Sequence, residues 1–351
     1  MKKILNNIFI SLLFILVSTC HNTNPINSPE EQPPNSRDYT WNVDTLDVQY
    51  LGELWGDSPN DIWAVEQFGY FVKQPWHYDG KKWTEYTKET VDCSCSTIFG
   101  FSANNIWIGG ETIWTNYGAI WHYDGTSWKE NFIYDVKGAY IYSIWGNSPN
   151  DIYACGTIWN NGKVFGFILH YDGVTWKENI RNKYNSQYLK IIGKKSNDKI
   201  YVFDYKFNDY SSSHDTITYD ELSGTELNEI YSNTVNNINW STFTNIDDEL
   251  YFLIGQDFYI YENGDFVKQL YLANHEDPFQ WHFFGRSAKD IFICMSYGLA
   301  QYNGEDIKYV YKFSQGGSSY EREDVIFDKE LFCVFKDYDN NKTMILHGKQ
   351  K

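Results

Sequence analysis

A nine-residue motif that recurs along the chain constrains the fold more than any other feature. It reads WGDSPNDIW at Trp55–Trp63, FGFSANNIW at Phe99–Trp107 and WGNSPNDIY at Trp145–Tyr153. Weaker copies end at four further aromatic residues: Tyr201, Tyr251, Phe292 and Phe332. Adjacent copies end 40 to 50 residues apart, the shortest interval running from Phe292 to Phe332 and the longest from Tyr201 to Tyr251. A period in this range indicates an array of one repeated structural unit.

A second motif, WHYDGKKW at Trp76–Trp83, follows the first motif in step. Its glycine recurs in six units, each time three residues before an apolar side chain: Gly80, Gly125, Gly173, Gly224, Gly264 and Gly304. The polar turn before Asp61 and the Asp79-Gly80 pair each separate two runs rich in aromatic and β-branched residues, as hairpin turns do. Each unit therefore predicts four antiparallel strands, which form one blade of a β-propeller.

The two ends of the chain predict how the ring of blades closes. The last unit stops at Lys351, where the other units begin their fourth strand, and Tyr39–Asn42 stands alone before the first unit with the Trp-polar pattern that opens that strand. We therefore expect residues 39–351 to form a seven-bladed β-propeller whose seventh blade takes its outer strand from the N-terminal segment. Such closure removes the free sheet edge that would otherwise promote aggregation.

The two motifs resemble the repeats of secreted bacterial β-propeller lipoproteins, which read Trp-Gly-x-Ser-x-x-Asp-Ile-Trp and His-Tyr-Asp-Gly-x-x-Trp. The resemblance covers most of residues 51–177. It implies an all-β propeller that is exported and attached to a membrane, and it implies no particular activity.

The N-terminus has the layout of a signal peptide. Lys2 and Lys3 precede the run Ile8–Val17, which is apolar apart from one serine and about half as long as the roughly 20 residues that a membrane-spanning helix needs. The ending at Cys20 resembles a lipobox, so we expect residues 1–19 to be removed and Cys20 to carry a lipid. Because Thr19 stands where a smaller residue is usual, cleavage by the ordinary signal peptidase remains an alternative.

Residues 20–38 hold four prolines and no aromatic residue, which is typical of a flexible tether between an anchor and a folded domain. The expected location is the cell envelope, at the outer membrane or cell surface rather than the inner membrane.

Composition excludes some partners. Aromatic residues make up 19% of the chain, which favours pleated sheet. The formal net charge is −17, and a surface this acidic repels phosphate, so we expect no binding to nucleic acid. The remaining partners are a glycan or an envelope protein, bound by a monomer that reaches the membrane through its lipid.

Candidate ligand-binding residues lie in the segments expected to join the second and third strands of the blades. Propellers generally bind ligands at the face that these segments build, and aromatic rings beside amides suit sugars, which offer an apolar face and a rim of hydroxyl groups. The candidates are Trp114, Tyr117, Trp159, Asn160, Phe207 and Tyr210. The alternative is that these aromatic side chains only cap the sheets of their own blades.

Other polar residues favour structural roles. The repeat-equivalent His77, His122, His170 and His347 are expected to bond within their own blades, so we predict no metal site and no cofactor. The Asn-Asp pairs of the first motif, such as Asn60-Asp61, are expected to bond their own turn backbone rather than calcium. A carboxylate clamp built from Arg181, Arg286 and Arg322 would require three different blades to converge.

The cysteines fall into two groups. Cys155, Cys294 and Cys333 lie in predicted second strands and are expected to be buried. Cys93 and Cys95 precede a first strand, and an oxidising compartment could join them in a local disulfide.

Together these features predict a non-catalytic binding module for glycans. Two alternatives remain open: a protein-interaction scaffold in the envelope, and a carbohydrate-active hydrolase or lyase. The enzyme would need two carboxylates facing each other across the axial pocket at roughly 5 to 9.5 Å. No catalytic residue can be assigned from the sequence.

Overall fold

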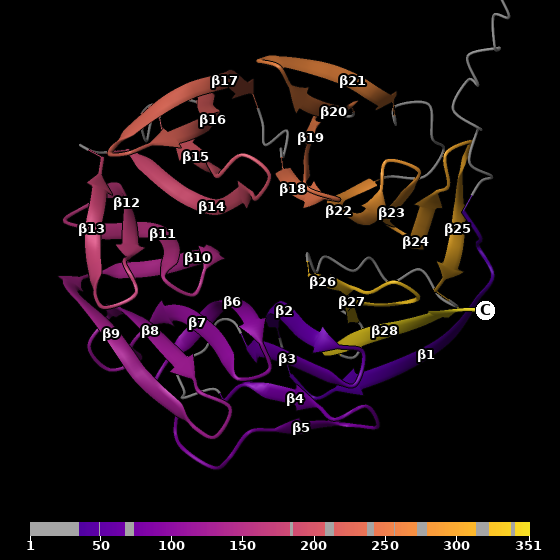
Figure 1. Cartoon of the computed structure of the whole chain (residues 1–351), viewed down its shortest axis with the longest axis horizontal. Helices are drawn as coiled ribbons and strands as arrows, with labels where there is room; N and C mark the ends of the chain where they lie inside the picture. The colour runs from indigo at the N-terminus through magenta and orange to yellow at the C-terminus, as the bar shows by residue number, and fades with distance from the viewer. Residues whose placement is uncertain are drawn as a thin grey trace, which may run out of the picture. The chain divides into compact units, whose positions relative to one another are not determined.

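The computed structural model describes residues 35–48, 50–66, 74–182, 185–207, 214–236, 242–255, 257–271, 279–313, 323–337 and 341–351. Their strands form seven four-stranded antiparallel sheets, arranged as blades around a central axis (Figure 1). The described residues contain no helix, and therefore none that is long and apolar enough to cross a membrane. The prediction of an all-β, seven-bladed propeller is confirmed. Residues 1–34, with the predicted signal peptide and Cys20, lie outside the described residues.

In each of the first six blades, the strands follow one another in sequence from the axis outward. Blade 1 consists of β2 (Leu51–Ser58), β3 (Asp61–Glu66), β4 (Trp76–Tyr78) and β5 (Trp83–Glu85). Blade 2 consists of β6 (Ser94–Ser102), β7 (Asn105–Glu111), β8 (Tyr117–Tyr123) and β9 (Trp128–Lys137). Blade 3 consists of β10 (Ala139–Ser148), β11 (Asp151–Asn160), β12 (Lys163–Tyr171) and β13 (Trp176–Arg181).

The next three blades repeat this order. Blade 4 consists of β14 (Ser186–Lys194), β15 (Lys199–Lys206), β16 (His214–Ser223) and β17 (Glu226–Asn236). Blade 5 consists of β18 (Thr242–Ile246), β19 (Glu249–Ile254), β20 (Asp257–Glu262) and β21 (Asp265–Tyr271). Blade 6 consists of β22 (Phe279–Ser287), β23 (Asp290–Met295), β24 (Gly298–Tyr302) and β25 (Ile307–Lys312).

Blade 7 closes the ring with strands from both ends of the chain. It consists of β26 (Asp324–Ile326), β27 (Glu330–Asp337), β28 (Lys342–Gln350) and, as its outer strand, β1 (Tyr39–Leu46). Trp41 of β1 pairs with Gly348 of β28, where an added Cβ would lie 2.4 Å from the Trp41 ring. The predicted closure by the N-terminal segment is confirmed.

The hydrophobic core lies between adjacent blades. In β7, the five consecutive residues from 106 to 110 are buried, because neighbouring blades cover both faces of the sheet. Trp107 of blade 2 packs in one cluster with Ile152 and Leu169 of blade 3. The apolar second strand of the repeat thus binds one blade to the next.

The repeat-equivalent histidines bond within their own blades, as predicted. Each lies on the third strand and contacts the first residue of the second strand: His77 Nε2 is 2.7 Å from Asp61 Oδ1, and His170 Nε2 is 2.7 Å from Asp151 Oδ1. The other two pairs are His122 with Asn105 and His347 with Glu330.

The prediction that the Asn-Asp pairs bond their own turn backbone is wrong for the second residue of the pair. Asp61 bonds the histidine rather than its own turn, and the serine of the motif holds that turn instead, because Ser58 Oγ accepts a hydrogen bond from the Asn60 amide at 3.3 Å. The second motif does use its Asp in this way: Asp79 Oδ1 accepts from the amides of Lys81 and Lys82, both at 2.9 Å.

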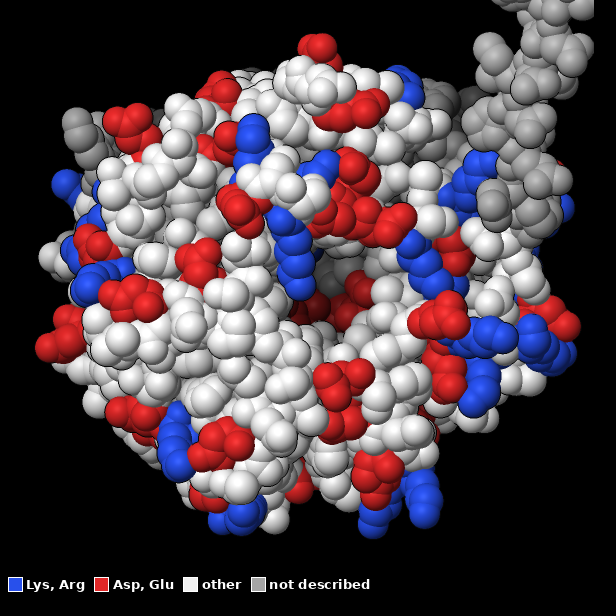
Figure 2. Space-filling view, viewed as in Figure 1, with Lys and Arg blue, Asp and Glu red and all other residues white. Residues whose placement is uncertain are grey.

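Polar side chains of the inner strands tie neighbouring blades together. Ser96 Oγ of β6 donates to the Ile141 carbonyl of β10 at 2.8 Å. Glu53 of β2 accepts from Thr97 Oγ1 at 2.6 Å and from the Ile98 amide at 2.9 Å in β6, and burial raises its pKa to about 7. The inner strands surround a central hollow, and Figure 2 shows acidic side chains in its depth and both acidic and basic ones at its rim.

The last residues of the predicted tether lie on the propeller. Asn35 Nδ2 donates to the Lys289 carbonyl at 2.8 Å, and Arg37 forms an ion pair with Asp306 at 2.7 Å. Both partners belong to turns of blade 6. Residues 35–38 are therefore part of the folded domain. They lead the chain from its contacts with blade 6 to β1 in blade 7.

Candidate ligand-binding face

The exposed aromatic side chains gather at one end of the blades. Among the described residues, the aromatic side chains that are exposed are Trp114, Trp159 and Tyr297, at 73%, 45% and 47%. All three lie where a second strand turns into a third strand: in blade 2, blade 3 and blade 6. Successive strands run antiparallel, so these turns share one end of the propeller, which we call the aromatic face.

Trp114 is carried by a tight turn between β7 and β8. The Thr112 amide donates to the Tyr117 carbonyl at 2.8 Å, and Thr112 Oγ1 accepts from the Tyr117 amide at 3.0 Å. Asn116 adopts a positive φ of 57°, a conformation that Asn tolerates better than most residues. These hydrogen bonds therefore fix the turn that exposes the Trp114 ring to solvent.

Backbone hydrogen bonds join this turn to Trp159. The Gly138 amide donates to the Asn116 carbonyl at 2.7 Å, and the Trp159 amide donates to the Gly138 carbonyl at 2.8 Å. Gly138 has a φ of 81°, and an added Cβ would lie 2.2 Å from the Trp159 carbonyl oxygen, so only glycine fits here. The two tryptophans thus belong to one connected surface across blades 2 and 3.

Trp159 also contacts blade 4. Its ring lies 6.3 Å from that of Phe207, edge to face, and Phe207 lies 5.0 Å from Tyr205. The indole of Trp159 donates a hydrogen bond to the hydroxyl of Tyr142, whose pKa is nonetheless raised because the group is buried. These contacts leave the exposed part of the Trp159 ring facing solvent in a fixed orientation.

The structure brings together some of the predicted site residues. Trp114, Trp159 and Phe207 lie on the aromatic face, where Asn160 is exposed beside Trp159 and Tyr117 forms the base of the Trp114 turn. Tyr210 lies outside the described residues. Tyr297 and Tyr142 were not among the residues predicted from the sequence. Tyr297 lies in the turn between the second and third strands of its blade, as Trp114 does, so aligning the repeats would indicate it.

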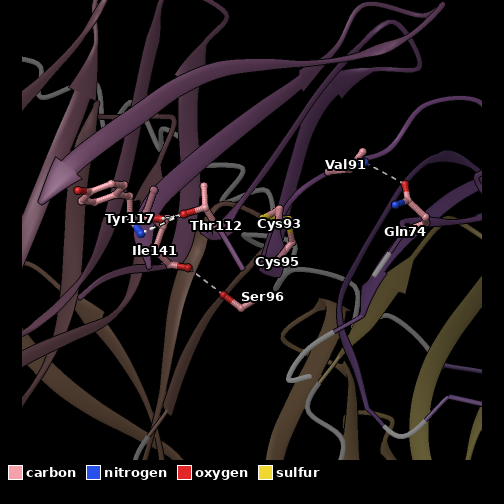
Figure 3. The surroundings of a disulfide bond; sticks show 8 residues. All are labelled: Gln74, Val91, Cys93, Cys95, Ser96, Thr112, Tyr117 and Ile141. Atoms are coloured by element: carbon pink, nitrogen blue, oxygen red, sulfur yellow. Dashed lines mark hydrogen bonds between the residues drawn. A yellow bond between two sulfur atoms is a disulfide. The ribbon is translucent and has the colours of Figure 1, made fainter. Parts of the chain in front are cut away.

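A disulfide lies beside the Trp114 turn. Cys93 and Cys95 are bonded and buried, and Cys95 pairs with Gly110 of β7, two residues before Thr112 (Figure 3). The Ser96 and Gln74 hydrogen bonds drawn in Figure 3 hold the same connection to neighbouring segments. The disulfide therefore fixes the entry into β6, which supports the base of the aromatic face.

We expect reduction of this disulfide to lower the free energy of unfolding by about 1.6 kcal/mol, because loop entropy depends on the residues enclosed and only three are enclosed here. Urea unfolding with and without reductant measures the change. Hydrogen exchange at Thr112 and Tyr117 should also become faster. A Cys93→Ala, Cys95→Ala double variant is the control, since its stability should not respond to reductant; an equal response would contradict the prediction.

Two arginines of the carboxylate clamp considered above are engaged near their own blades. Arg181 bonds Glu178 and Tyr134, and Arg286 bonds Asp290 at 2.5 Å, each within or beside its own blade. Arg322 lies outside the described residues. No group of three or more His, Cys, Asp or Glu side chains within the described ranges is placed to hold a metal ion.

The carboxylates of the inner strands act as ties between blades. Asp324 of β26 is 2.9 Å from His282 of blade 6, and Glu53 bonds blade 2 as described above. The two carboxylates repel each other, which contributes to the raised pKa of Glu53.

Comparison with known proteins places the chain among β-propellers. No protein-family model matches the sequence, and a search of curated proteins finds no relative. Solved structures that resemble it include Chaetomium thermophilum Raptor (TM-score 0.58, 10% identity, 90% of this chain) and the extracellular domain of a putative hybrid two-component system from B. thetaiotaomicron (0.55, 10%, 87%). The β-propeller domain of the trilobed protease from Pyrococcus furiosus (0.51, 13%, 88%) is a third.

The chain matches 30% and 39% of the first two proteins and 95% of the third. At these identities the likeness establishes the fold alone.

Proposed function

We propose that this protein is an exported, lipid-anchored β-propeller that binds carbohydrate through its aromatic face. One observation carries the proposal: the three exposed aromatic side chains of the described residues all lie on that face. The turns at the opposite end, such as the one that contains Val174, carry mainly charged and small polar residues. A folding role does not require tryptophan at 73% exposure.

The chemistry of the face suits a sugar better than a flat apolar ligand. Trp159 and Trp114 offer ring faces for the C–H side of a pyranose, and the amide of Asn160 lies beside Trp159 to bond hydroxyl groups. Tyr142 and Phe207 fix the Trp159 ring, so little conformational entropy is lost when a ligand binds.

We expect Trp159→Ala and Trp114→Ala each to weaken glycan binding about tenfold, because each removes a stacking surface. A glycan array with the unmodified protein selects the ligand, and isothermal titration of that ligand measures each variant. Val174→Ala is the matched control, because Val174 is 86% exposed at the opposite end of blade 3. Equal affinity for the tryptophan variants and the control would contradict the proposal. Array silence combined with partner capture by crosslinking would favour the protein scaffold instead.

The anchor is tested separately. Cys20→Ala should release the protein from the membrane fraction, and protease treatment of intact cells should digest the lipidated form if it faces outward. Release of both forms would remove the lipid from the proposal and leave carbohydrate binding to be judged by the titration alone.

A further inference from the structure

A second polar site lies between blades 3 and 4. A cavity of about 450 Å³ is lined by β13 of blade 3 and by all four strands of blade 4. The charged and aromatic side chains that line it are Arg181, Tyr188, Asp204, Lys206, Asp220 and Glu229. Its volume falls in the range of sites for small organic ligands.

Two carboxylates are buried at this site. Asp204 is 1% exposed and Asp220 is 5% exposed. Asp204 Oδ2 accepts from Ser186 Oγ at 3.0 Å, and the Gln187 amide also stabilises the carboxylate, whereas Oδ1 has no donor in hydrogen-bond geometry among the described residues. Asp220 Oδ2 accepts from Thr218 Oγ1 at 3.1 Å. A buried carboxylate oxygen without a donor is costly and is uncommon unless a ligand or water supplies the bond.

The repeat shows that these two acids are not required by the fold. Asp204 is the sixth residue of the second strand of blade 4. The residues at this position in the other blades are Glu66, Gly110, Gly156, Ile254, Met295 and Phe335. Asp220 pairs with Val202; the residues that pair at this position in the other blades are Trp76, Trp121, Leu169, Tyr259, Ala300 and Leu346. Blade 4 alone therefore places acids at both positions, and both line the same cavity.

The charges of the cavity favour a cation. Arg181 is neutralised by Glu178, to which it donates at 3.1 Å. Asp204, Asp220 and Glu229 then face one cation, Lys206, which lies 3.8 Å from the carboxylates of Asp204 and of Glu229. Three negative charges and one positive charge leave a formal charge of −2. Lys206 is too far from either carboxylate for a direct hydrogen bond and so does not satisfy Asp204.

We propose that this cavity binds a small organic molecule through a primary ammonium group, which donates hydrogen bonds to Asp204 and Asp220. An ammonium group supplies both the charge and the N–H donors that Asp204 Oδ1 lacks. The cavity is larger than an inorganic cation needs, and the described residues offer no group of three ligands for a metal. Tyr188 and Leu227 add apolar surface for the carbon skeleton. The cavity shares none of the residues named for the aromatic face, and the proposal does not depend on carbohydrate binding.

The proposal predicts a specific pH dependence. Burial raises the pKa of Asp204 to about 7, although the neighbouring charge of Lys206 lowers it. Asp220 also has a raised pKa, and Glu229, Arg181 and Tyr188 complete the titratable surroundings. An ammonium group binds the ionised carboxylate, so its affinity should rise with pH, by about tenfold from pH 6 to pH 8 for a pKa of about 7. At pH 7 binding should release about half a proton from Asp204.

The test is calorimetric titration of the purified protein with matched probes. Ethanolamine and 1,4-diaminobutane carry primary ammonium groups, and ethylene glycol and 1,4-butanediol are their neutral partners. We expect saturable binding of the amines, at least tenfold tighter than of the diols. Repeating the titration in buffers of different ionisation enthalpy measures the released proton. Amines that bind no better than diols would refute the proposal, and so would sodium or calcium binding that the amines do not displace.

Four variants locate the site. Asp204→Asn should weaken amine binding about tenfold and flatten its pH dependence, whereas Asp172→Asn, in an exposed turn of blade 3, should change neither. At a pH where both carboxylates are ionised, Lys206→Met should strengthen amine binding about fivefold by removing the competing cation, a gain that a misfolded variant could not produce. The same substitution should move the pH dependence upward, because the charge of Lys206 lowers the pKa of Asp204. Trp159→Ala should leave amine binding unchanged, which separates this site from the aromatic face. Amine binding that survives Asp204→Asn unaltered would place it elsewhere and overturn the assignment.

Discussion

Trp107→Ala should lower the free energy of unfolding by about 3 to 5 kcal/mol, the usual cost of removing a large buried aromatic side chain. Trp107 is 3% exposed and stacks on His122 with ring centroids 4.2 Å apart. It also lies 5.2 Å from Tyr171 and 5.9 Å from Trp176 in blade 3. Its loss would therefore open a cavity between two blades. Urea unfolding followed by far-ultraviolet circular dichroism measures the change.

Trp114→Ala is the matched control for this prediction. Trp114 lies in the same blade and loses the same atoms on substitution, but it is 73% exposed. Its free energy of unfolding should change by no more than about 0.5 kcal/mol. Equal destabilisation by the two variants would mean that the contacts between blades 2 and 3 do not carry the stability assigned to them.

Deletion of β1, residues 39–46, should have the largest effect on stability. The strand forms eight backbone pairs with β28, from Tyr39 with Gln350 to Leu46 with Thr343. Tyr39 and Leu46 are buried, and Trp41 packs on Gly348 and Tyr311. Burying three such side chains contributes roughly 5 to 9 kcal/mol, which approaches the whole stability of an ordinary domain. We expect loss of the cooperative unfolding transition and aggregation through the exposed edge of β28.

Thermal unfolding with light scattering tests the closure. Deletion of residues 21–34, which precede the segment that contacts blade 6, is the control and should leave the transition unchanged. If the variant without β1 unfolds cooperatively at an unaltered temperature, then the pairing of β1 with β28 is not what holds the ring closed.

Local patterns determined most of the architecture. The copies ending at Trp63, Trp107 and Tyr153 gave the number of strands per unit, and the glycine after Asp79 placed the outer hairpin. The lone Tyr39–Asn42 segment predicted the partner of β28, which the structure confirms. These inferences succeeded because strand alternation and turn chemistry act over a few residues, and because each repeat presents the same pattern again.

Partners of polar side chains were harder to infer. The sequence placed Asp61 in a turn, where an Asp commonly bonds the nearby backbone, yet in the folded blade it meets His77, 16 residues away. Whether Cys93 and Cys95 would pair also remained open, since the spacing alone does not show that both side chains point to the same side. Such choices depend on the register of strands that meet only after the sheet has formed.

The sequence by itself thus determined the all-β class, the seven units and the strand that closes the ring. Only the tertiary structure decided which side chains share a site. Trp114 and Trp159 are 45 residues apart and are joined through Gly138, and Asp204 and Asp220 become neighbours of one cavity through strand pairing and the packing of blade 4 on blade 3. A repeat pattern fixes the fold of each blade because it is local. A binding site depends on how adjacent blades pack, and contacts between distant residues leave no local signal.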